Sequence, residues 1–446
     1  MAGTYLLRTF GTPDGPGGGT FIWTMSAWVK KTGTGGDVGI MTRYVNSGKY
    51  VKIFFNSDDQ LEYAVYNSSY QARYQTSARY RDTNGWYHIV VAQNSTLATA
   101  ADRVKIYVNG ELITSFAVNT QIGQNIGGDF NTASAPHQIG AYNATQFFNG
   151  LMSAFNFIDN TQYAASDFGS TDATTGQWKI NTAPSVTYGA TGFSILNNGN
   201  TITDQSTNSN NWSEEGTPGI VSNTKDCPSN VFTTLNVLER LGSSITVSNG
   251  NTQFFNQASD WRTMISNLAF PNTGKFYAEM QVNEVSSAVQ VGIMAQSSFT
   301  SHFQADLGTQ GQYNSYAYLN TGQKRTNSST TSYGNSFGNP SIIRIAVDMD
   351  NKNIYFAKDG VWQNSGNPES GATGTGAAFT DLQNDKSYCF AVASQGSNPK
   401  VSWNFGNGVF GTTAVTSAGT AGSTPGTFEY NVPSGYEPLT TKGLNA

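Results

Sequence analysis

Two tyrosine-rich stretches of this chain have the residue types that recognise sugars or protein surfaces. One runs from residue 66 to residue 74 and the other from residue 310 to residue 316. Aromatic rings stack on sugar rings, and amides or charged groups bond to hydroxyl groups, but the same side chains suit protein contacts. We predict that both stretches are exposed loops. The candidate contact residues are Tyr66, Tyr70, Arg73, Tyr74, Tyr313 and Tyr316.

The acidic residues lack the spacing of a sugar-cleaving site. Retaining hydrolysis of a glycosidic bond needs two carboxyl groups about 5 Å apart on one side of the substrate. No Glu-x-Asp-x-x-Glu strand supplies such a pair here. Glu214 and Glu215 are adjacent, so on a strand they would point to opposite faces. We therefore predict no catalytic residue and no enzyme, with a glycoside hydrolase as the less favoured alternative.

Calcium is the metal that the loop carboxylates could bind. Asp58, Asp59 and Asp102 fall between predicted strands, and oxygen ligands suit this ion. Solvated polar turns explain the same residues, and this is the preferred interpretation, so no cofactor is expected. His88 and His137 show no metal-binding spacing, and His88 is expected to be a hydrogen-bonded structural residue.

The elements that would position these residues are β-strands. Residues 103–113 and 353–362 each alternate apolar and polar side chains around a central Asn-Gly or Asp-Gly pair. These pairs tolerate the positive φ angles of a tight antiparallel hairpin. The same alternation marks residues 21–30, 50–55, 61–66 and 86–92 in the first half, and 275–282, 289–293, 343–349 and 388–393 in the second.

The pattern predicts an all-β protein with two tandem antiparallel β-sandwiches. The first sandwich spans residues 1–160 and the second, with a C-terminal tail, spans residues 245–446. Residues 161–244 are rich in Asn, Thr, Ser and Gly with scattered aromatic residues, which indicates an ordered connector. A chain of 446 residues is long enough for two such cores.

Composition excludes several classes of partner. Charged residues make up 12% of the chain and the net charge is −5, which is unsuited to nucleic acid because that partner needs concentrated positive charge. No stretch has the ~20 apolar residues of a membrane span. The first residues lack the basic and apolar regions of a signal peptide, so synthesis in a host cytoplasm without processing is expected. Cys227 and Cys389 form one bridge or remain two thiols.

The first half resembles concanavalin-A-like sandwiches of the laminin-G type, and the second resembles SPRY domains. Residues 21–31, 85–90, 104–110 and 148–153 carry the first resemblance. Residues 273–279, 291–293, 347–350, the hairpin at Asp359-Gly360 and residues 403–406 carry the second.

The order of motifs along the whole chain is similar to that of virion proteins of marine bacteriophages. The matching stretches are residues 3–13, 167–169, 188–193, 210–212, 226–236 and 433–439. The resemblance implies a fibre, spike or capsid-decoration protein of the virion, with other virion proteins as partners. It also implies a homo-oligomer, for which a trimer is favoured, and weak adhesion to host surface carbohydrate. In a particle with many copies, protein contact is the preferred role of both tyrosine-rich stretches. A free glycan-binding protein is the alternative.

Overall fold

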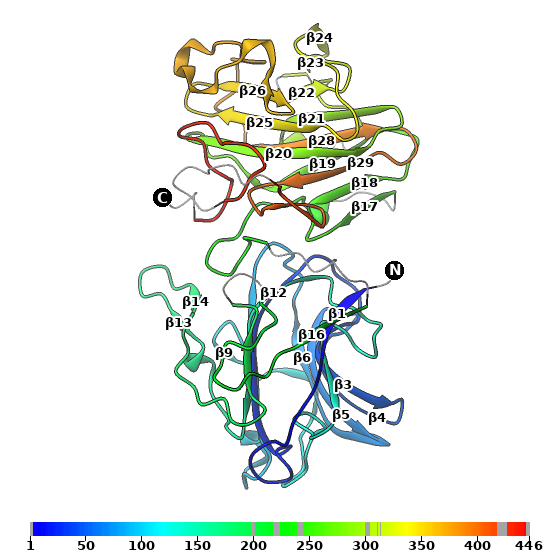
Figure 1. Ribbon diagram of the computed structural model, residues 1–446, viewed down its shortest axis with the longest axis vertical. Helices are drawn as coiled ribbons and strands as arrows, with labels where there is room; N and C mark the ends of the chain where they lie inside the picture. Colours follow the sequence, from blue (N-terminus) through cyan, green and yellow to red (C-terminus); the bar gives the residue numbers. More distant parts are fainter. Residues whose placement is uncertain are drawn as a thin grey trace. The chain divides into compact units, whose positions relative to one another are not determined.

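The computed structural model divides into two compact units, Met1–Val221 and Ser222–Ala446. It describes residues 3–197, 201–216, 224–239, 244–298, 304–309, 311–312, 314–416 and 426–442. Each unit consists of two packed antiparallel sheets (Figure 1). The predicted all-β class with two tandem sandwiches is therefore confirmed. Among the described residues, no helix is long and apolar enough to cross a membrane.

The first unit contains an eight-stranded and a six-stranded sheet. In spatial order, the larger sheet contains β10 (Phe116–Thr120), β6 (Ser69–Arg79), β5 (Gln60–Asn67), β4 (Lys49–Phe55), β3 (Val38–Asn46), β11 (Pro136–Ile139), β1 (Thr4–Thr9) and β16 (Ser213–Gly216). The smaller contains β15 (Phe193–Ile195), β12 (Gly150–Asp159), β2 (Ile22–Lys31), β7 (Tyr87–Asn94), β8 (Val104–Val108) and β9 (Glu111–Leu112). A hairpin, β13 (Gly169–Thr171) and β14 (Trp178–Ile180), and two short 3₁₀ turns, η1 (Ala100–Asp102) and η2 (Ala165–Asp167), lie outside these sheets.

In the part of it that the structure describes, the predicted connector, residues 161–244, does not form a separate layer. It supplies β15 and β16 to the two sheets of the first unit. Further side chains from it, including Phe168 and Trp178, pack with Val90 and Ile158 of the six-stranded sheet. This packing explains why β2 is buried on both faces although its sequence alternates. Within this unit, the connector thus covers the outer face of the six-stranded sheet.

The second unit has a seven-stranded and a six-stranded sheet. The first contains β17 (Ile245–Ser248), β18 (Gln253–Asn256), β29 (Lys400–Asn404), β20 (Lys275–Glu284), β25 (Ile342–Asp348), β26 (Asn353–Lys358) and β27 (Val361–Trp362). The other contains β19 (Arg262–Ala269), β28 (Tyr388–Gln395), β21 (Ala288–Ala295), β22 (Ser315–Leu319), β23 (Gln323–Thr326) and β24 (Ser329–Ser332). A small pair, β30 (Val409–Phe410) and β31 (Thr413–Ala414), and the 3₁₀ turns η3 (Val237–Glu239), η4 (Gln363–Ser365) and η5 (Pro368–Thr373) complete it.

Both predicted hairpins are confirmed. β8 and β9 are joined at Asn109 and Gly110, which have φ angles of 50° and 84°. β26 and β27 are joined at Asp359 and Gly360, with φ angles of 48° and 88°. Positive φ at both central positions gives the turn the twist that matches the flanking strands. The two cysteines of the chain do not form a disulfide bond.

Candidate functional site

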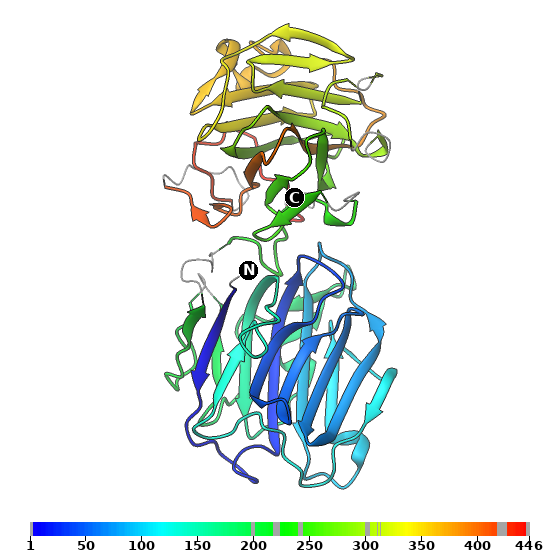
Figure 2. The same cartoon turned by 90° about the vertical axis from the view of Figure 1, so that its right-hand side faces the viewer.

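The outer face of the eight-stranded sheet carries a group of neighbouring tyrosines. Side chains alternate along β4 and β5, so one set enters the core and the other set faces outward. The strands of this sheet face the viewer in Figure 2. The outward set includes one tyrosine from each of four adjacent strands, joined by one from the loop after β11. We call Tyr44, Tyr50, Tyr66, Tyr70 and Tyr142 the tyrosine face.

Strand register brings the five rings together. Tyr50 lies opposite Tyr44 on one side and opposite Tyr66 on the other. The Tyr50 and Tyr66 rings are stacked with centroids 5.0 Å apart, and Tyr70 meets Tyr66 edge-on at 5.0 Å. Tyr142 makes edge contacts with Tyr44 at 5.4 Å and with Tyr50 at 5.6 Å. The result is a continuous aromatic surface over four strands.

Charged residues lie among these rings. Arg73 donates to Glu62 through Nε and one terminal nitrogen, at 3.1 Å and 3.2 Å. Its guanidinium also lies over the Tyr70 ring, 4.9 Å from the centroid. The ammonium of Lys52 lies 3.7 Å from the centroid of the Phe54 ring. The face therefore combines ring surfaces with polar and charged groups.

The phenol groups of Tyr50 and Tyr142 are neutral at physiological pH. Burial is the main cause that raises the pKa of Tyr142 to about 12, and it raises the pKa of Tyr50 further above its ordinary value. A neutral phenol both donates and accepts hydrogen bonds. The face can thus bond to hydroxyl groups at its ring edges while ring surfaces contact apolar C–H groups.

Of the six predicted contact residues, Tyr66 and Tyr70 belong to the tyrosine face, and Arg73 lies over the Tyr70 ring. The prediction that residues 66–74 form a loop is wrong, because β5 and β6 pair through this stretch and turn at Asn67 and Ser68. Since strand side chains alternate, Tyr74 points into the core, where it is 4% exposed.

Of the second predicted group of contact residues, Tyr316 is not presented at the surface. Tyr316 is fully buried in β22, and its hydroxyl donates to the carbonyl of Asp381. An apolar core surrounds its ring, so this residue cannot contact a partner. Tyr313 lies outside the described residues.

Sequence analysis missed Tyr44, Tyr50, Lys52 and Tyr142. The alternation within β4 already places Tyr50 and Lys52 on one face, which was the available signal. Tyr142 had no such signal because it follows β11 and reaches the face through the fold.

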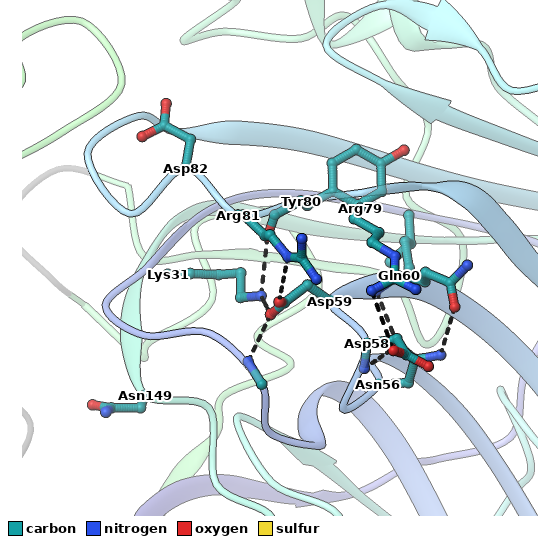
Figure 3. A network of polar contacts seen from close by, with 12 residues as sticks. Lys31, Asn56, Asp58, Asp59, Gln60, Arg79, Tyr80, Arg81, Asp82 and Asn149 are labelled. Atoms are coloured by element: carbon teal, nitrogen blue, oxygen red, sulfur yellow. Dashed lines mark hydrogen bonds and ion pairs between the residues drawn. The ribbon is translucent and has the colours of Figure 1, made fainter. Parts of the chain in front are cut away.

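The predicted calcium-ligand carboxylates are each paired with a cation. Asp59 is buried and accepts from Lys31 at 2.6 Å, from the Gly35 amide at 2.9 Å and from Arg81 at 3.2 Å (Figure 3). Asp58 pairs with Arg79 at 3.3 Å, and Asp102 pairs with Lys105 at 2.8 Å. No group of three or more His, Cys, Asp and Glu side chains that could hold a metal ion occurs in the described part of the chain. The expectation of no cofactor, with calcium as the less favoured alternative, stays untested.

We expect Asp59→Asn to lower the free energy of unfolding by about 2 kcal/mol, since it weakens charge-assisted bonds to the buried Lys31 ammonium. Burial alone would raise the pKa of Asp59, but the bonds from Lys31, Gly35 and Arg81 outweigh it and lower that pKa. Urea unfolding at pH 7 measures the effect. Asp58→Asn is the control, because its pair with Arg79 is exposed and should contribute below about 1 kcal/mol. Equal losses in the two variants would contradict the structural role of Asp59.

In the described part of the chain, neither the adjacent glutamates nor the serine motif considered below has the surroundings of a catalytic site. Glu214 and Glu215 occupy successive positions of β16, so they face opposite sides as expected. The chain was expected to lack a Gly-x-Ser-x-Gly serine nucleophile motif, but residues 334–338, Gly-Asn-Ser-Phe-Gly, have its spacing. That motif requires a strand, a sharp turn and a helix. Here the segment lies between β24 and β25 with no helix after it, so Ser336 lacks the required setting.

Comparison with known proteins agrees with the two folds. Residues 12–166 match the family model for the concanavalin A-like lectin/glucanases superfamily, and residues 274–408 match the model for the SPRY domain. The chain therefore carries a concanavalin-A-like domain followed by a SPRY domain. Domains of these kinds indicate a module for carbohydrate binding or protein interaction, and they are generally not enzymes.

Solved structures similar to this chain include two human SPRY domains and a toxin. The SPRY domain of human HERC1 is 17% identical, with a TM-score of 0.29, over 38% of this chain and 96% of that chain. Stonustoxin is 17% identical, with a TM-score of 0.30, over 40% of this chain and 27% of that chain. A human SPRY domain is 13% identical, with a TM-score of 0.28, over 36% of this chain and 94% of that one. A search of curated proteins found no match.

Proposed function

We propose that this protein binds carbohydrate without cleaving it, through the tyrosine face of its concanavalin-A-like domain. The observation that carries the proposal is the continuous ring surface of Tyr50, Tyr66 and Tyr70 across adjacent strands. A sugar ring presents C–H groups on its faces and hydroxyl groups around its edge. Ring stacking with phenol, guanidinium and ammonium groups nearby matches both features.

We further propose that the protein acts on a virus particle, as a capsid decoration, fibre or spike. Low charge, abundant neutral polar residues and the order of phage-like motifs along the chain support this setting. Its partners there are other virion proteins and further copies of itself, with a trimer favoured. Many copies turn weak single-site sugar binding into firm attachment to a host surface.

We expect Tyr50→Ala to weaken glycan binding about tenfold, since it removes the central stacking ring. The measurement is binding of the full chain to a glycan array, followed by titration of the best oligosaccharide. Tyr107→Ala is the control, because Tyr107 is a partly buried tyrosine on the opposite sheet. Unchanged binding by Tyr50→Ala would contradict the role of the tyrosine face. Release of reducing ends from the bound sugar would contradict binding without cleavage.

Cryo-electron microscopy of purified particles that carry this protein tests the virion setting. Ordered, symmetric density for the protein on the capsid or tail is the expected result, and it would give the copy number. Absence of such density would contradict the virion role and favour a free glycan-binding protein.

A further inference from the structure

Lys52 is a cation enclosed by aromatic rings at the centre of the tyrosine face. Its Nζ atom lies 3.7 Å from the ring centroid of Phe54, 5.0 Å from that of Tyr142 and 5.4 Å from that of Tyr50. Ring faces attract an ammonium group but supply no lone pair to its three N–H donors. Among the described residues, no oxygen atom forms a hydrogen bond or ion pair with this ammonium.

The neighbouring cations differ from Lys52 because each pairs with a carboxylate. Arg73 is neutralised by Glu62, which is 1% exposed. Lys49 and Arg43 both pair with Asp129, at 3.3 Å and 3.0 Å. One positive charge on this face, that of Lys52, therefore has no counter-charge in direct contact.

Strand register explains why no acidic side chain reaches Lys52. Its cross-strand neighbours are Thr42 on β3 and Ala64 on β5, both short and uncharged. Burial is the main cause that lowers the pKa of Lys52, although Glu62 and Asp37 oppose this effect from a distance. A partly desolvated ammonium without an acceptor costs free energy that an anionic ligand would recover.

We propose that the tyrosine face binds an anionic saccharide, whose carboxylate or sulfate group accepts hydrogen bonds from Lys52. The sugar ring would stack beside this group on Tyr50 and Tyr66. This inference rests on the proposed carbohydrate binding and specifies its ligand class. Charge complementarity favours an acidic sugar over a neutral one, because a neutral hydroxyl group leaves the ammonium charge uncompensated.

Matched probe pairs test the ligand class with the full chain. A uronic acid oligosaccharide is compared with its carboxyl-reduced form, and a sulfated galactose oligosaccharide with its desulfated form. We expect at least one anionic probe to bind between tenfold and a hundredfold more tightly than its neutral partner. This range corresponds to the contribution of a hydrogen bond to a charged group, about 1.5–3 kcal/mol. The preferred pair distinguishes a carboxylate from a sulfate. Added salt should weaken the preference.

Lys52→Met removes the charge and keeps an apolar stem, so it should abolish the preference for the anionic probe. Lys52→Arg should retain part of it. Lys105→Met is the control, since it changes net charge equally but lies on β8 of the opposite sheet.

The outcomes separate the two proposals. If Tyr50→Ala weakens binding while charge removal from Lys52 or from the probe does not, the tyrosine face binds neutral sugar and this inference is overturned. If neither Tyr50→Ala nor Lys52→Met changes the binding of any probe, the proposed function fails as well.

Discussion

Acidification from pH 6.5 to pH 4 is expected to destabilise the first unit by about 3 kcal/mol for each of two buried histidines. The pKa of His88 and that of His137 are both lowered to about 3, chiefly by burial. An unfolded histidine titrates near 6.5, so between these values the unfolded chain binds more protons than the folded protein. Stability is therefore fully present above pH 6.5 and is lost as the pH falls toward 3.

Hydrogen bonding adds to burial in keeping His88 neutral. Trp178 donates from Nε1 to Nδ1 of His88 at 3.0 Å. The proton of the neutral ring must then be on Nε2, which donates to Ser26 Oγ at 2.9 Å. A second proton would have to enter at Nδ1 and break the bond from Trp178. The histidine is thus a structural residue: its ring stacks on Trp28 with centroids 4.9 Å apart, and its Nδ1 accepts from Trp178.

His137 resists protonation for a different reason. Its Nδ1 donates to the carbonyl of Ala135 at 3.0 Å, and its ring stacks on Phe10 with centroids 3.9 Å apart. Nε2 is buried without a hydrogen-bond partner in the described structure. Protonation there would place a cation in the core near Arg43 and Arg8, which lower the pKa further.

Two measurements check this pH dependence. NMR of ring-labelled histidine, assigned with His88→Gln and His137→Gln, should show no titration of either ring between pH 8 and pH 4.5. Urea unfolding should show that the double variant loses less stability over the same range than the native chain. A midpoint near 6.5 for either ring in the folded protein would contradict the prediction.

The strands were predicted from local patterns, because the alternation and turn residues that mark a strand are neighbours in sequence. The hairpin at Asn109-Gly110 needs only two residues with positive φ between alternating segments, and both are visible in sequence. β15 and β16 were missed for the opposite reason. They have three and four residues and gain their stability by pairing with β12 and β1, which are distant in sequence.

The tyrosine face was predicted only in part, because the register of strand pairing brings its residues together from different strands. Tyr66, Tyr70 and Arg73 belong to one hairpin, so a single stretch of sequence revealed them together. Tyr50 joins them through the pairing of β4 with β5, and Tyr44 through the pairing of β3 with β4. The exposure of Tyr74 was predicted wrongly because a loop was assumed where the strand alternation continues.

Replacing Glu279 by Ala is expected to lower the free energy of unfolding of the second unit by about 5 kcal/mol. Glu279 is fully buried on β20, and its carboxylate accepts four hydrogen bonds. Two come from the Glu429 and Tyr430 amides at 2.8 Å and 3.0 Å, and two from Tyr277 Oη at 2.9 Å and Asn404 Nδ2 at 3.2 Å. These bonds attach the C-terminal segment to the seven-stranded sheet.

The large effect follows from the groups that Glu279 would leave behind. Arg344 is 6% exposed and donates from Nε to Tyr277 Oη at 2.7 Å, and Tyr277 in turn donates to Glu279. Without the carboxylate, the buried guanidinium loses the nearby anion that attracts it through Tyr277 and across space. Two partly buried backbone amides also lose their acceptor, at about 1–3 kcal/mol each where no water replaces it.

A matched acidic residue on the same strand provides the control. Glu284 is 53% exposed in its side chain and pairs with Lys400 at 3.2 Å, so Glu284→Ala should cost less than about 1 kcal/mol. Urea unfolding compares the two variants, and hydrogen exchange should show faster exchange of the Glu429 and Tyr430 amides in Glu279→Ala alone.

If Glu279→Ala does not fold, Glu279→Gln keeps the prediction testable. The amide retains one acceptor oxygen but directs an N–H group at donors that previously met a carboxylate. It should therefore cost about 2–3 kcal/mol and accelerate exchange of one of the two amides more than the other. A loss equal to that of Glu284→Ala, with exchange unchanged at both amides, would show that the C-terminal segment is held by its apolar contacts. Those contacts are the packing of Phe428 and Tyr436 against Tyr277 and Tyr355.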